Sequence, residues 1–348
     1  LYAVHWLELV VFCVCAWIAG WMIFRRLDAA WLTFLAVVFC RELRETTGQA
    51  LTETLSYAVS GLFFLSWIYA WRTCRRPAWL LTGVALGLLI LAKPAATAII
   101  PTAIVLLAVM LFAKRDGDTH LRVTAGNAAV FVAGAAAVTV PLLLRNYVEL
   151  GVFALSSPQY LTATFAHRLG YNAMCWTEWL TGWLFYLPDF GDTLARKWLP
   201  EATYDRLGWD PQSYYVYGRD VLHQQGERAA RTAVNSYLFR EYVLAEPVKH
   251  AAVTLLLAWR GMFVGKLWGL IAFLLLPAAL IGAKQQRMML ALMLAPAVVV
   301  LFGQAALSVS IQRYNGLLVL PLALTTTALV VMLWDRWRPH RKAGSRQP

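Results

Sequence analysis

Carboxylate and cationic side chains recur at the ends of long apolar segments, where several of them could act together. Glu42 and Glu45 lie in CRELRETTGQALTETL, and Glu53 follows at the start of the next apolar segment. Lys93 precedes a proline in the middle of LGLLILAKPAATAIIPTAIVLL. The other polar groups at such positions are Arg145, Asn146, Arg313 and Tyr314.

Carboxylates beside cations suit chemistry on a phosphate-bearing lipid at a membrane surface. The cations would hold the phosphate, and a carboxylate would remove a proton as general base. Each group alone also has a structural explanation: Lys93 can extend to lipid headgroups, and Arg41 and Arg44 can pair with neighbouring acids. The hypothesis of a site therefore depends on whether these groups gather on one side of the membrane.

The composition excludes a soluble globular protein. Of the 348 residues, 60% are hydrophobic and 14% are charged, and the mean hydropathy is +0.57. Apolar runs near membrane-spanning length recur along most of the chain, which predicts an all-α polytopic membrane protein with about nine transmembrane helices. We expect these helices at residues 6–24, 30–40, 49–71, 79–92, 95–113, 123–144, 267–283, 288–307 and 317–334.

The distribution of charge predicts the orientation of these helices. The net charge is +12, and alternate loops hold fifteen of the 31 Lys and Arg residues beside four acids. Cytoplasmic loops carry such an excess, so we expect these loops inside and the opposite loops, with all the candidate site residues, outside. The excess of cations is explained without nucleic acid, and we expect no nucleic acid partner.

Four parts follow from this topology. Residues 1–145 form a membrane domain of six helices, and residues 267–334 supply the last three. Residues 146–266 are expected to form a small, mostly helical extracytoplasmic domain, with an amphipathic helix beginning at Pro247. Residues 335–348 form a basic cytoplasmic tail. The five cysteines form no CxxC pair and the histidines lack ligand spacing, so no metal residues are assigned.

Four segments in order resemble the GT-C glycosyltransferases, in the bacterial branch related to dolichyl-phosphate-mannose protein mannosyltransferases and aminoarabinose transferases. QALTETLSYAVSGLFFLSWIYAWR resembles a helix that begins with a Thr-Glu pair. WLLTGVALGLLILAKPAATAIIP resembles a Gly-x-x-x-Gly-Leu hairpin with a cation before proline. VPLLLRNYVELGVFALSS resembles a helix that ends in Arg-Asn, and QRYNGLLVLPLAL resembles the Arg-Tyr entry to a late helix.

The resemblance implies transfer of a sugar from a polyprenyl-phosphate-linked donor to a lipid, glycan or protein acceptor, at the outer face of the bacterial inner membrane. Glu53 would be an acidic residue lining the site, and Lys93 would contact the lipid phosphate. Arg145 and Arg313 would be its partners. The family's catalytic aspartate lies in a first outer loop, which would precede Leu1, so we expect a missing N-terminal segment. The family includes members with and without a divalent cation, so metal dependence stays open.

There are three alternative interpretations of the function. An O-antigen polymerase or ligase-like enzyme would also combine many helices with a large outer loop and arginines for a lipid diphosphate. A transporter would need inverted repeats and charges at the membrane midplane, and neither is found. A non-catalytic membrane scaffold is the third alternative.

Overall fold

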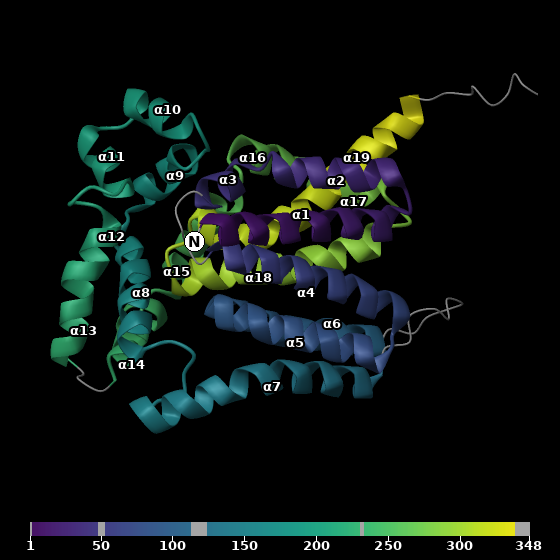
Figure 1. Cartoon of the computed structure of the whole chain (residues 1–348). Coiled ribbons are helices and arrows are strands. Elements are labelled where there is room, and N and C mark those ends of the chain that lie inside the picture. Colours follow the sequence, from purple (N-terminus) through teal and green to yellow (C-terminus); the bar gives the residue numbers. More distant parts are fainter. Residues whose placement is uncertain (1, 48–52, 113–123, 230–232, 338–348) are drawn as a thin grey trace, which may run out of the picture.

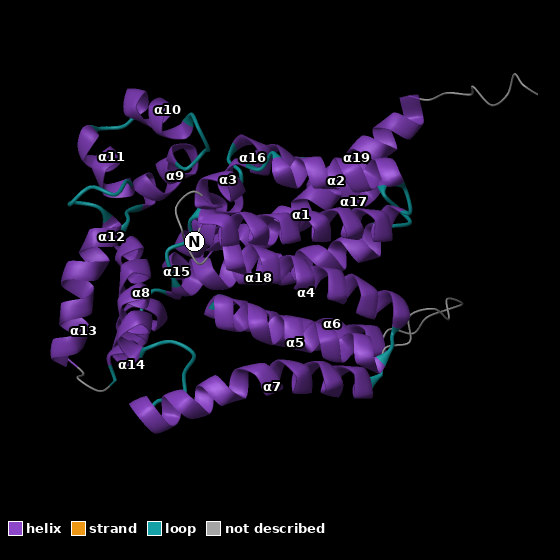
Figure 2. Ribbon diagram, in the orientation of Figure 1, coloured by secondary structure: helices purple, strands orange, loops and turns teal. Residues whose placement is uncertain are grey.

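The described part of the chain is a helical protein with no β-strand. The structure is a computed structural model in which residues 2–47, 53–112, 124–229 and 233–337 are described. Helices make up almost all of these residues (Figure 2). This confirms the all-α class. The expected helix at 49–71 begins outside the described residues. Most of the expected tail at 335–348 also lies outside them.

Long, roughly parallel helices form a bundle, and a layer of short helices covers one end of it (Figure 1). The bundle helices are α1 (Tyr2–Phe24), α2 (Leu27–Val38), α4 (Glu53–Thr73), α5 (Arg76–Ala92), α6 (Ile99–Phe112), α7 (Ala125–Leu150), α18 (Arg287–Leu307) and α19 (Val319–Trp337). Short helices connect them: α3 (Arg41–Thr47), η1 (Pro94–Ala98), α16 (Leu267–Leu274), α17 (Leu276–Gly282) and η5 (Gln312–Leu318).

The covering layer corresponds to the expected helical domain at 146–266. Its elements are α8 (Pro158–Gly170), η2 (Tyr171–Ala173), α9 (Trp176–Phe185), α10 (Gly191–Trp198), α11 (Glu201–Leu207), α12 (Tyr214–Tyr217), η3 (Gly218–Leu222), α13 (His223–Ala229), α14 (Val234–Phe239) and η4 (Arg240–Leu244). Helix α15 (Pro247–Met262) begins at the expected proline and packs on α18, and so joins this layer to the bundle.

The expected nine transmembrane helices are not confirmed. In the described residues, four helices are long and apolar enough to cross a membrane: α1, α7, α18 and the continuous stretch Gln312–Trp337. The pair α15 and α16 would make a fifth, although it bends by 114°. The segment expected at 267–283 is divided into α16 and α17, because Pro277 starts a new helix. Helices α2, α5 and α6 are shorter than the spanning length.

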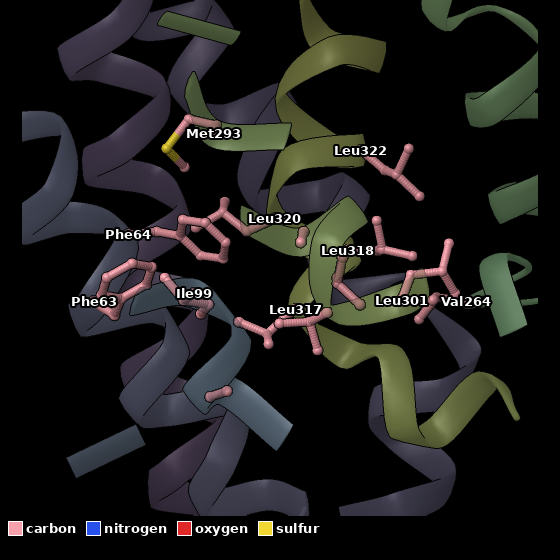
Figure 3. Close-up of a cluster of buried hydrophobic side chains, with 14 of the residues drawn as sticks. Phe63, Phe64, Ile99, Val264, Met293, Leu301, Leu317, Leu318, Leu320 and Leu322 are labelled. Carbon is pink, nitrogen blue, oxygen red and sulfur yellow. The ribbon is translucent and has the colours of Figure 1, made fainter. Parts of the chain in front are cut away.

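Aromatic and aliphatic side chains fill the bundle around α4. Trp67 and Trp71 are fully buried and pack edge-on against Trp79 of α5, while the indole N–H of Trp67 donates to the carbonyl of Leu292 at 3.0 Å. Phe63 and Phe64 lie close to Leu317 and Leu320, at the junction of η5 and α19 (Figure 3). The chain that follows the candidate residues Arg313 and Tyr314 is therefore anchored in the core.

The glycines of the apolar hairpin bring α5 and α7 into close contact. A Cβ atom on Gly83 would lie 2.1 Å from the carbonyl oxygen of Phe131. That separation is shorter than a side chain tolerates, so only glycine fits at this crossing. The Gly-x-x-x-Gly spacing thus has a packing role in this chain.

The described parts of the loops expected to be cytoplasmic include two that lie at the end of the bundle opposite the covering layer. The turn between α1 and α2 lies there, as does the end of α19 (Figure 1). Arg26 bonds to both Asp28 and Asp335 at 2.6 Å, which joins the first turn to the last helix. The candidate residues Glu42, Glu53, Lys93 and Arg313 therefore belong to the end that faces the covering layer.

Candidate functional site

A cleft with two chambers lies where the covering layer meets η5 and the end of α15. The smaller chamber has a volume of 460 Å³ and the larger one 580 Å³. Trp209, Arg260 and Gln312 line both, so the chambers adjoin each other. The smaller chamber is completed by Glu42, Tyr215, Val309, Ile311, Arg313 and Tyr314.

The short helix η5 presents Arg313 and Tyr314 to the smaller chamber. Asn315 leaves helical geometry (φ −105°, ψ 27°), and its side chain donates to Ser310 Oγ at 2.9 Å and to the carbonyl of Ile311 at 3.0 Å. Gly316 follows directly under the ring of Tyr57, where a Cβ atom would lie 1.8 Å from a ring carbon. The buried Asn315 and the close approach at Gly316 thus fix the direction of the two side chains before them.

Lys93 reaches this helix from the hairpin between α5 and η1. Its backbone is extended, and Pro94 starts the next helical turn, so the lysine lies at the turn itself. Its ammonium group donates to the carbonyl oxygen of Tyr314 and lies 5.9 Å from the centre of the Tyr314 ring. The structure therefore brings Lys93 to Tyr314, as the hypothesis of a shared site requires.

Glu53 and Arg313 face each other beside Lys93. Arg313 Nε lies 3.9 Å from Glu53 Oε1, which is an ion-pair separation. This Nε atom is buried and has no hydrogen-bond partner among the described residues. The Arg313 guanidinium also lies 5.2 Å from the centre of the Tyr314 ring. The Arg313 side chain as a whole is 39% exposed and lines the smaller chamber, so its guanidinium can meet an oxyanion that enters the cleft.

The three candidate carboxylates have different surroundings. Glu45 forms an exposed pair with Arg41 at 2.5 Å, and Glu53 faces Arg313. Glu42 lines the smaller chamber and has no ion-pair partner within 4.0 Å among the described residues. Burial, reinforced by repulsion from Glu45, raises the pKa of Glu42 above its ordinary value. A carboxyl with a raised pKa is the better proton acceptor, so Glu42 is the strongest candidate for a general base.

Arg145 and Asn146 do not line either chamber. Arg145 is exposed on α7, before its last turn, and pairs with Glu149 at 3.0 Å. The Asn146 amide donates to the carbonyl of Ala154 at 2.7 Å, and Gly151 ends the helix in a left-handed conformation (φ 68°). These groups close the C-terminus of α7, which ends well away from α3 (Figure 1).

Arg260 and Trp209 were missed by the sequence reasoning. Arg260 is 6% exposed, and its guanidinium lies 4.5 Å from the ring of Trp209 and 4.8 Å from the ring of Tyr186. The stretch HAAVTLLLAWRGMF was assigned to an amphipathic helix, in which one arginine gives no distinct signal. Trp209 lies in a long segment with no periodic pattern. Both are brought to the cleft only by tertiary packing.

The described residues hold no cluster of three or more His, Cys, Asp or Glu side chains that could bind a metal ion. The divalent cation that the resemblance left open therefore has no assigned ligands here.

No protein family, curated protein or solved structure matches this chain. The arguments about its function therefore rest on the cleft and on the four sequence segments.

Proposed function

We propose that this protein is a membrane glycosyltransferase that moves a sugar from a polyprenyl-phosphate donor to a lipid, glycan or protein acceptor. The observation that carries the proposal is the meeting of Lys93, Glu53 and Arg313 around Tyr314. They come from three separate segments, and Arg313 lines the smaller chamber together with Glu42. The cations suit the phosphate of the donor, and the cleft suits its sugar.

In the proposed reaction, Glu42 accepts the proton of the acceptor hydroxyl. The acceptor oxygen then bonds to the anomeric carbon as the bond from that carbon to the phosphate oxygen breaks. Polyprenyl phosphate leaves with the bonding electron pair, and the anomeric configuration inverts. Lys93 and Arg313 stabilise the negative charge that develops on the phosphate. Stabilisation of developing charge by fixed groups is usually the largest single contribution to catalysis.

Aromatic side chains in the smaller chamber support a sugar as the transferred group. Trp209 and Tyr215 both line this chamber, and their rings pack edge-to-face at 5.2 Å. Ring faces give apolar contact to the C–H groups of a sugar, while Gln312 and Glu42 offer polar groups to its hydroxyls. We propose that the cleft opens at the outer face of a bacterial inner membrane, since the basic loops lie at the other end.

Turnover of the donor tests the proposal. The protein would be purified, placed in liposomes and supplied with polyprenyl-phosphate hexose labelled in the sugar, with release or transfer of label measured. We expect Lys93→Ala to lose at least about tenfold in turnover while Arg145→Ala keeps it, since Arg145 pairs only with Glu149 on an exposed face. Equal loss in both variants, or no turnover by the unaltered protein with any labelled hexose or pentose donor, would contradict the proposal.

A further inference from the structure

Arg260 is a buried cation whose charge is met by aromatic rings and a hydroxyl. It donates to the hydroxyl of Tyr171 at 3.1 Å and lies between the rings of Tyr186 and Trp209. Within the described residues no carboxylate lies within 4.0 Å of it. Buried charges are normally paired with an opposite charge, so Arg260 departs from the usual pattern.

Two acids near this region are engaged by other groups, and Glu42, which lines the smaller chamber with Arg260, forms no ion pair with it within 4.0 Å. Asp189 lies 3.8 Å from Arg41 and 3.7 Å from Lys266. Glu178 pairs with Arg206 at 3.0 Å and also accepts from Tyr214. The larger chamber does carry acids, at Asp189, Asp192 and Asp210, but it also carries Arg196 and Lys266. Its three acids and three cations, Arg260 included, balance, but none of these acids forms an ion pair with Arg260 within 4.0 Å.

Arg260 also occupies the junction of the two chambers. It lines both of them, together with Trp209 and Gln312, whereas Arg313 lines only the smaller one. Lys93 lines neither. The smaller chamber thus carries two cationic side chains: Arg313, which lies next to Tyr314 and Lys93, and Arg260, which also borders the larger chamber. A reaction between two substrates needs a binding position for each.

We propose that Arg260 binds an oxyanion, a phosphate ester or a carboxylate, carried by the second substrate. The guanidinium lies against the rings of Tyr186 and Trp209 and donates through Nη1 to Tyr171, so Nε and Nη2 are the atoms proposed to bond to such a group. Only the identification of the oxyanion as part of the acceptor rests on the proposed sugar transfer. The oxyanion site itself stands on the geometry of Arg260.

Fluorine NMR of the full chain in detergent tests the site. The protein would be labelled with 5-fluorotryptophan, and the Trp209 signal would be assigned by its loss in Trp209→Phe. Inorganic phosphate, pyrophosphate and acetate would then be titrated separately. We expect a saturable shift of the Trp209 signal, because Trp209 stacks on Arg260. A shift with the two phosphates alone identifies a phosphate ester, and an equal shift with acetate identifies a carboxylate.

Variants make the test specific. Arg260→Gln should abolish the shift, and Arg260→Lys, which retains the charge without the planar fork, should weaken binding at least about tenfold. Arg219→Gln, at an exposed arginine paired with Asp220, is the matched control and should bind normally. Folding of each variant would be checked by gel filtration and circular dichroism. If Arg260→Gln fails to fold, Arg260→Lys decides.

Three outcomes would overturn the inference: no Trp209 shift with any of the three anions, a shift that persists at full strength in Arg260→Gln or Arg260→Lys, or a shift that disappears in Lys93→Ala. The last would place the anion at the lipid-phosphate position. The outcome of this titration can be distinguished from a failure of the proposed sugar transfer. A protein that shifts on titration but turns over no donor would retain the oxyanion site and lose the sugar transfer.

Discussion

The ammonium group of Lys93 donates a hydrogen bond to the main-chain carbonyl of Tyr314, although 221 positions separate the two residues in the sequence. The hairpin that ends α5 and the broken helix that precedes α19 are thereby joined at the cleft. Arg313 neighbours Tyr314 and faces Glu53. The contact between Lys93 and Tyr314 therefore also positions Arg313 and Glu53 relative to Lys93. Lys93 thus has both a binding role to test and a positioning role.

Lys93→Gln and Lys93→Arg separate these two roles. Gln can still donate to the Tyr314 carbonyl but carries no charge, so we expect folded protein with kcat lowered by about 10²-fold or more, the scale seen when a charge-stabilising group is removed. Arg keeps the charge and should retain more activity than Gln. Steady-state kinetics with labelled donor measures both. Equal kcat values in the two variants would limit Lys93 to positioning.

Glu42 should make the stability of the protein depend on pH. Burial raises its pKa in the folded state above the ordinary 4.5. Between 4.5 and that raised value the folded state binds more protons than the unfolded state, so stability falls as pH rises through this window. Glu42→Gln removes the penalty. We expect this variant to melt at a higher temperature than the unaltered protein at pH 7, and at nearly the same temperature below pH 4.5.

The same variant tests the chemistry of Glu42. Gln cannot accept the proton, so donor transfer should fall by about 10²- to 10⁴-fold, as is usual for loss of a general base. If Glu42→Gln is both more stable and inactive, Glu42 lowers the stability of the folded protein and is needed for activity. Full activity of Glu42→Gln across the pH range would exclude it as the base.

The crossing of α5 and α7 can be tested with two glycines in different surroundings. A Cβ on Gly83 would meet backbone at 2.1 Å, whereas the nearest atom to a Cβ on Gly303 would be 3.8 Å away. Gly83→Ala should therefore destabilise the protein by about 1–3 kcal/mol through overpacking. Gly303→Ala should be neutral or gain up to about 1 kcal/mol, because alanine favours a helix. Thermal unfolding in detergent would measure both, and equal effects would contradict the close crossing.

Arg168 should hold the covering layer on the bundle. It is fully buried in α8 and donates to the carbonyl of Ala305 in α18, to Asn172, and to the carbonyl of His250 and the hydroxyl of Thr254 in α15. Arg168→Met would leave these acceptors unpaired and should cost about 3 kcal/mol or more. The exposed Arg219→Met is the control.

Limited proteolysis would follow the effect of Arg168→Met. We expect cleavage between α7 and α15 to become faster in this variant, with cleavage of the bundle unchanged. Uniform sensitivity in all three proteins would show that the layer is held by other contacts.

The helical class, the start of α15 at Pro247 and the ends of α18 follow from composition, proline and periodicity, which are local signals. The helix expected at 123–144 instead continues to Leu150, because polar residues such as Arg145 and Asn146 do not by themselves end a helix. The number of membrane crossings could not be derived from these local signals. Hydropathy does not show, for example, that Pro277 divides one apolar run into two short helices. Helices α2 and α5 were expected as short crossings and are indeed short. Whether a short helix crosses a membrane depends on its neighbours.

The site was predictable only where its residues carry an unusual local pattern. Lys93 before proline and Arg313-Tyr314 before an apolar helix stand out, and the structure brings them together. Arg145-Asn146 carries an equally clear pattern, yet it caps α7. Arg260 has no local pattern at all. Its burial between two aromatic rings arises from contacts between α15 and the covering layer, which no window of sequence reveals.

The place of α19 has a consequence for how the protein is made. Its stretch Gln312–Trp337 is 78% buried over its most apolar window, and it contacts α2, where the hydroxyl of Thr327 bonds to Thr33 at 3.0 Å. Helix α19 thus occupies an interior position among helices that precede it in the chain. Until α19 is made, those helices leave an apolar groove open, so this part of the bundle can close only after they have all been synthesised.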